Sequence, residues 1–101
     1  NKSFTNFTNI VQNFFPNLSS VTGQATYKDS QVKELNVTIS TQFYSATEIT
    51  NFANYVAQVA PNYLPKGVPV KISISSSSNM QAYVTKQAND DKYTTTILGN
   101  N

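Results

Sequence analysis

The sequence predicts an α+β fold in which two helices cover one face of a mostly antiparallel sheet of four to five strands. Two segments carry apolar residues at helical spacing, and the others alternate apolar with polar residues, as half-buried strands do. The predicted order is α-β-β-α-β-β-β, and most links between strands are too short for parallel pairing. A chain of 101 residues has room for one core, so residues 1–101 are expected to form a single domain.

The first helix is predicted from apolar residues that recur three and four positions apart from Phe4 onward. Ser3 or Thr5 can cap its start, and Pro16 is expected to end it, because proline disfavours helical backbone at the preceding residue. The other face of this helix carries Asn, Thr and Gln with almost no positive charge. The helix is therefore expected to pack on a core and not to lie on a membrane.

A β-hairpin is predicted next. Alternating residues 21–27 and 35–43 flank the turn-forming stretch KDSQ, residues 28–31. The second helix follows, because Ser45 and Glu48 have the spacing of a capping box, in which each side chain bonds a backbone N–H of the other residue. An apolar stripe starts at Ile49, and Pro61 is expected to close the helix.

The stretch VKISISSSSNM, residues 70–80, begins as a strand and runs into four serines. Its alternation continues to Ser76, so the serines are expected to begin inside the strand, which leaves the core at Ser75 or Ser76. A new alternation starts at Met80. The last two strands are predicted in QAYVTKQ and YTTTIL, which flank the turn ANDDK.

The residue types needed for most enzyme chemistry are missing. The chain has no His and no Cys, so it lacks the usual general base, thiol nucleophile and soft metal ligands. Its five acids fall in predicted turns, at a helix cap or at a strand start, and none stands in an apolar setting that would favour acid–base catalysis. We expect no catalytic residues, no metal site and no cofactor.

Charge is sparse: charged residues make up 12% of the chain, about half the usual share in soluble domains. There is no arginine, and the seven lysines are scattered along the sequence, so nucleic acid is not an expected partner. A polar, weakly charged and cysteine-free chain fits a location outside the cytoplasm, at the cell surface or secreted.

Tyrosine is the residue type best suited to recognition here, because it combines a large rigid ring with a polar tip. Tyr83 is out of phase with Ala82 and Val84, so it is expected on the polar face of the sheet. Tyr93 and Tyr44 lie at strand ends. Tyr83, Tyr93 and Tyr44 are the candidate binding surface.

The Asn-, Thr-, Ser- and Tyr-rich composition, without Cys or Arg, resembles small lipoproteins or surface proteins of low-GC Gram-positive bacteria. That resemblance implies a cystatin-like or similar α+β fold. The order from Phe4 to Ile74 is also similar to ring-building domains of secretion and sporulation assemblies and to envelope domains of lipid-associated osmotic-stress proteins. The final hairpin departs from the ring-building pattern.

These observations favour a non-catalytic extracytoplasmic domain that binds a protein or a cell-envelope polymer. The alternative is a structural self-assembly module of an envelope or secretion complex, in which an edge strand pairs with another copy. A membrane is expected as a partner only through a lipid anchor. We expect the encoded stretch before Asn1 to hold a signal peptide that ends in a lipidated Cys, followed by a short polar linker.

Overall fold

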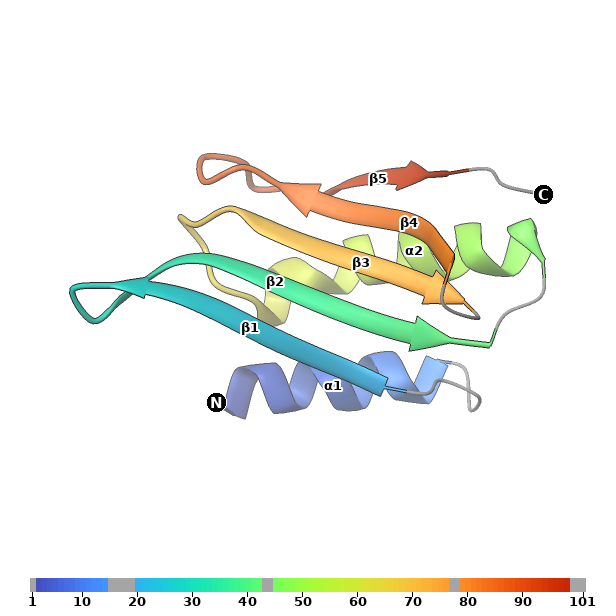
Figure 1. Ribbon diagram of the computed structural model, residues 1–101, viewed down its shortest axis with the longest axis horizontal. Helices are drawn as coiled ribbons and strands as arrows, with labels where there is room; N and C mark the ends of the chain where they lie inside the picture. Colours follow the sequence, from blue (N-terminus) through green and yellow to red (C-terminus); the bar gives the residue numbers. More distant parts are fainter. Residues whose placement is uncertain (1, 15–19, 43–44, 77–78, 99–101) are drawn as a thin grey trace.

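The computed structural model describes residues 2–14, 20–42, 45–76 and 79–98 (Figure 1). It confirms the predicted α+β class and element order. The elements are α1 (Lys2–Phe14), β1 (Ser20–Lys28), β2 (Gln31–Thr41), α2 (Ala46–Tyr63), β3 (Val70–Ser76), β4 (Asn79–Lys86) and β5 (Thr94–Ile97).

The five strands form one sheet in the order β1-β2-β3-β4-β5. β2 and β3 are parallel, and α2 is the crossover between them, whereas the other neighbouring pairs are antiparallel. The sheet is therefore mostly antiparallel, as predicted. The parallel pair aligns Val37 with Ile72 and Ile39 with Ile74, so the central strands turn their apolar side chains to the same face.

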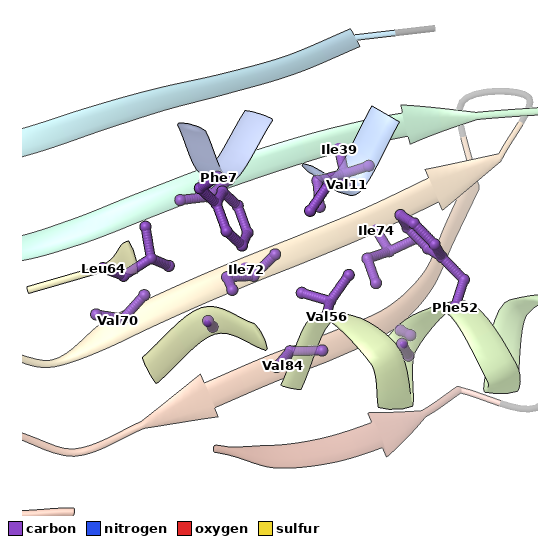
Figure 2. Packing of buried hydrophobic residues seen from close by; sticks show 14 of the residues in the cluster. Phe7, Val11, Ile39, Phe52, Val56, Leu64, Val70, Ile72, Ile74 and Val84 are labelled. Atoms are coloured by element: carbon purple, nitrogen blue, oxygen red, sulfur yellow. The ribbon is translucent and has the colours of Figure 1, made fainter. Parts of the chain in front are cut away.

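Both helices lie on one face of the sheet (Figure 1). Phe7 and Val11 of α1, together with Phe52 and Val56 of α2, are fully buried against the central strands. Figure 2 shows these side chains meeting the inward-facing residues of β2, β3 and β4. Burying a side chain of this size contributes about 1.5–3 kcal/mol, so this layer is the main source of stability.

The turn between β1 and β2 consists of Asp29 and Ser30, which have φ values of 56° and 70°. Positive φ at both central residues is the signature of a type I′ turn, whose twist matches that of the two strands. Lys28 pairs directly with Gln31 across this turn. The predicted hairpin is confirmed, and its tip projects beyond the helices at one end of the molecule (Figure 1).

Of the two hydrogen bonds of the capping box predicted at the start of α2, the structure confirms the one to the Ser45 side chain. Ser45 is the N-cap, and its hydroxyl accepts a hydrogen bond from the Glu48 N–H at 3.1 Å. The end of α2 does not follow the prediction, because Pro61 lies inside the last turn and the helix continues to Tyr63. The N–H of Leu64 still bonds the carbonyl of Ala60 at 2.9 Å. The side chains of Ala60 and Leu64 are both buried, and this packing keeps the chain helical beyond Pro61.

The third strand ends at Ser76, as the serine run predicts. Ser76 does not face water, however: it continues the inward phase of β3 and is only 7% exposed. Thr41, its partner in the parallel register, is also buried, and its hydroxyl donates to the Ser75 carbonyl at 3.1 Å. Side-chain hydrogen bonding therefore lets the inner face of the sheet end in polar residues without leaving the core. Residues 77–78 lie outside the described part of the chain.

Candidate functional site

One face of the sheet is covered by the helices, and the opposite face, called here the outer face, is not (Figure 1). The pairing register aligns its side chains in rows that cross the strands. Two such rows are Thr22, Thr38, Ser73, Tyr83 and Thr96, and Gln24, Asn36, Lys71, Thr85 and Thr94. These two rows offer hydroxyl and amide groups, one aromatic ring and one ammonium group.

Tyr83 is the aromatic group of the outer face, as its phase predicts. The Nζ of Lys71, on the neighbouring strand β3, lies 4.6 Å from the centre of the Tyr83 ring. This distance is within the range of a cation–π contact, which is worth about 0.5–1 kcal/mol at an exposed site. The contact holds the only lysine of these two rows against the only ring, so the pair forms a defined feature on an otherwise hydroxyl-rich surface.

Tyr93 lies on the helix side of the sheet. It packs against the hydrophobic core and borders a small hollow with Pro61, Leu64 and Lys86. Its hydroxyl is buried and has no hydrogen-bond partner among the described residues. Burial raises the pKa of Tyr93 to about 12, because the charged phenolate loses solvation there.

The structure therefore does not bring Tyr83 and Tyr93 together, since they lie on opposite sides of the sheet. Tyr44, the third candidate, falls outside the described residues. Whether any of the three binds a ligand remains a prediction. Of the three, Tyr83 has the placement that a binding role requires.

The lysines, scattered in sequence, gather at one end of the molecule, called here the basic end. They lie at the start of α1, around the β1–β2 turn, in the loop after α2, at the start of β3, at the end of β4 and in the loop before β5 (Figure 1). The seven residues are Lys2, Lys28, Lys33, Lys66, Lys71, Lys86 and Lys92. Four of the five acids share this end, which leaves three more positive than negative charges, and Glu48 lies at the other end.

An apolar hollow of about 280 Å³ opens at the same end. It lies where the β1–β2 hairpin extends over the start of α1 and the end of α2. Its lining residues are Phe4, Gly23, Ala25, Tyr27, Val32, Leu35, Tyr63, Leu64 and Pro65. The individual strand patterns did not reveal this hollow, because it depends on how far each element extends along the sheet.

The described residues contain neither a metal-binding cluster nor a membrane-spanning helix. Within them, no three His, Cys, Asp or Glu side chains gather in a way that could hold a metal ion. Neither α1 nor α2 has the length and apolar character needed to cross a bilayer. The features of this part of the chain that are suited to interaction are thus the outer face and the basic end with its hollow.

Solved structures share this architecture. A sex pheromone precursor from Lactobacillus salivarius subsp. salivarius UCC118 is 50% identical with a TM-score of 0.92, over 99% of this chain and 30% of that one. A sex pheromone staph-cAM373 precursor is 28% identical with a TM-score of 0.87, over 97% of this chain and 35% of that one. The C-terminal domain of the staph-cAM373 precursor from Staphylococcus aureus shares the fold at 22% identity, with a TM-score of 0.84 over 99% of this chain and 29% of that one.

This chain thus spans about a third of the length of the solved structures that it matches. None of the curated proteins compared with it matches. The family described as CamS sex pheromone cAM373 precursor matches residues 1–92, which is most of the sequence. The chain therefore belongs to the CamS sex pheromone cAM373 precursor family.

Proposed function

We propose that this chain is a non-catalytic, extracytoplasmic domain of a membrane-tethered lipoprotein, and that its outer face binds a protein or polymer of the cell envelope. Family membership supports the location, because a pheromone acts between cells and its precursor fits an exported protein. The sparse charge supports the same location, and the absence of cysteine and histidine supports a non-catalytic role. Lactobacillus salivarius and Staphylococcus aureus, the organisms of two of the solved structures described above, are Gram-positive, which fits the compositional resemblance.

The observation that carries the proposal is the outer face, which neither described helix covers and on which Tyr83 lies within a row of hydroxyl groups. Ser73 and Thr96 lie beside Tyr83 on the neighbouring strands, and the Nζ of Lys71 lies over the face of the Tyr83 ring. Hydroxyl groups can donate and accept hydrogen bonds, and the ring adds a rigid contact area. Such a face suits a polar, weakly charged ligand better than an apolar one.

The proposal is tested by co-sedimentation with purified Gram-positive cell walls, prepared with and without their bound proteins. We expect the chain to bind and Tyr83→Ala to weaken binding by about tenfold or more, as expected for the loss of a large aromatic contact. The matched control is Tyr27→Ala, which removes a tyrosine from the helix side of the sheet. If Tyr83→Ala binds as well as the parent, the outer face is not the binding surface.

Self-assembly is the second candidate, and strand β1 is the observation that favours it. β1 is an edge of the sheet, has nine residues and contains no proline, whereas the opposite edge strand β5 has only four residues. A long edge strand exposes backbone groups to which another copy can pair. Analytical ultracentrifugation over a range of concentrations tests this, since a sedimentation coefficient that does not change with concentration argues against assembly.

The lipid tether is tested separately on the native protein. We propose that the precursor carries a lipidated cysteine at its mature N-terminus, because the composition of the chain resembles that of small Gram-positive lipoproteins. Metabolic labelling with a fatty-acid analogue should mark the protein. If the native protein carries no label and is found in the culture medium, it is secreted and the tether is wrong.

A further inference from the structure

The basic end carries positive charge that the fold does not neutralise. Within the described residues, which include every lysine, no lysine forms an ion pair with a carboxylate. Six of the seven lysines are exposed. The seventh, Lys86, is buried and donates to the carbonyl oxygens of Val68 and Gln87. The exposed ammonium groups are therefore available to an external anion.

The opposite end of the molecule is different. Its only charged residue is Glu48, although it also exposes apolar side chains such as Phe14 and Met80. The basic end thus carries a net charge of +3 and the opposite end one of −1, which together give the net charge of +2. A negatively charged surface would attract this end. The molecule would then be oriented with the basic end toward the surface and its long axis pointing away from it.

Apolar groups lie beside the lysines at this end. Tyr27, close to the tip of the β1–β2 hairpin, is 64% exposed and pairs with Val32 across the hairpin. Both residues line the apolar hollow, and each is followed directly by a lysine, Lys28 or Lys33. Pro65, on the other side of the hollow, is likewise followed by Lys66. An exposed tyrosine and an open apolar hollow are thus bordered by cations.

This combination distinguishes between anionic partners. A soluble polyanion would bind the lysines but would not bury Tyr27 or fill the hollow. Nucleic acid would favour arginine, which the chain lacks. A lipid surface satisfies both features, because tyrosine prefers the boundary between headgroups and acyl chains, and lysine is attracted to anionic headgroups.

We propose that the basic end docks on an anionic lipid surface, with Tyr27 at the interface and the neighbouring lysines against the headgroups. The outer face, which runs along the length of the sheet, stays clear of the membrane in this orientation. Docking would therefore add to the binding role proposed above and does not depend on it. It would also revise the expectation from the sequence that the membrane is reached only through a lipid anchor.

Vesicle co-sedimentation of the chain without any lipid anchor tests the proposal. One set of vesicles contains equal parts of phosphatidylcholine and phosphatidylglycerol, and the other contains phosphatidylcholine alone. We expect binding to the anionic vesicles only, and about tenfold weaker binding for Tyr27→Ala and for the double variant Lys28→Gln/Lys33→Gln. The matched control, Met80→Ala, removes an exposed apolar side chain from the opposite end and should bind like the parent.

Two results would overturn the proposal. One is that the parent does not bind the anionic vesicles at low ionic strength. The other is that Tyr27→Ala binds like the parent while soluble polyphosphate competes fully, which would reduce the interaction to charge alone. Circular dichroism of each variant checks the fold, and Tyr27 is exposed enough for its replacement to leave the core intact. The cell-wall assay with Tyr83→Ala tests the outer face separately. Ligand binding by the outer face and lipid docking of the basic end can therefore fail independently.

Discussion

The ring of Phe4 on α1 lies directly against the backbone of Gly23 on the edge strand β1. A Cβ atom placed on Gly23 would be 2.7 Å from Cζ of Phe4, closer than real Cβ contacts allow. Glycine in a strand interior is otherwise unfavourable, because it loses more backbone entropy on folding than other residues do. The close approach of the helix to the strand explains why glycine is suited to this position.

Gly23→Ala is expected to destabilise the fold by about 1–3 kcal/mol, because the added methyl group forces the Phe4 ring out of its place. Chemical denaturation of the single and double variants measures this effect. In a Phe4→Ala background the ring is absent, and Gly23→Ala should then be neutral or slightly stabilising. Equal costs of Gly23→Ala in both backgrounds would show that the ring contact does not govern this position.

Tyr93→Phe is expected to stabilise the protein by about 1 kcal/mol, because it removes a buried hydroxyl that has no hydrogen-bond partner. The ring packing against the core is retained. The control is Tyr27→Phe, which removes an exposed hydroxyl and should leave the free energy of unfolding unchanged. A loss of stability in Tyr93→Phe would mean that the hydroxyl bonds a group or a water inside the protein.

The stability of the parent is expected to fall above about pH 10 through Tyr93. In the unfolded chain the phenol loses its proton near pH 10, whereas in the folded chain burial raises the pKa of Tyr93 to about 12. Between these values the unfolded state binds fewer protons than the folded state, so the free energy of unfolding decreases as pH rises. Denaturation at pH values from 8 to 11 should show a smaller decrease for Tyr93→Phe than for the parent.

Lys86→Ala is expected to cost about 1–3 kcal/mol, since it removes a buried donor from the carbonyl of Val68, which it reaches at 2.7 Å. Lys86→Met keeps most of the apolar stem, so the difference between the two variants separates packing from hydrogen bonding. Lys92→Ala is the control, because Lys92 is exposed and makes no hydrogen bond within the described residues. A Lys86→Met variant as stable as the parent would show that the two carbonyl contacts contribute nothing.

The alternation and the helical spacing of apolar residues predicted the elements well, because burying one face of a strand or helix imposes these patterns on the sequence. The alternation from Val70 to Ile74 reports which side chains of β3 meet the helices, and the alternation around Tyr83 on β4 placed that residue on the outer face. Tyr93 starts the predicted strand YTTTIL, in which Ile97 and Leu98 are apolar on opposite faces, so the alternation did not show that Tyr93 points to the core.

Two features required the tertiary structure. The rule that proline ends a helix is local, and at Pro61 the packing of Ala60 and Leu64 outweighed it. The gathering of the lysines depends on the order and direction of the strands, which bring residues as distant as Lys2 and Lys92 to the same end. A sequence in which every lysine is isolated can therefore still fold into a molecule with one basic end.

The cap of α2 provides the last prediction. The Ser45 hydroxyl accepts the Glu48 N–H at 3.1 Å and lies 3.4 Å from the Glu48 carboxylate, to which it can donate. Ser45→Ala removes this acceptor from the first turn and is expected to cost about 1 kcal/mol, whereas Ser45→Asp should retain most of the stability through its carboxylate. α2 is the crossover between β2 and β3 and carries Phe52 and Val56 into the core. Fraying of its first turn should therefore also make the central strands open more often. Amide hydrogen exchange of β3 should therefore accelerate in Ser45→Ala and not in Ser45→Asp, and unchanged exchange in both would limit the role of the cap to the helix end.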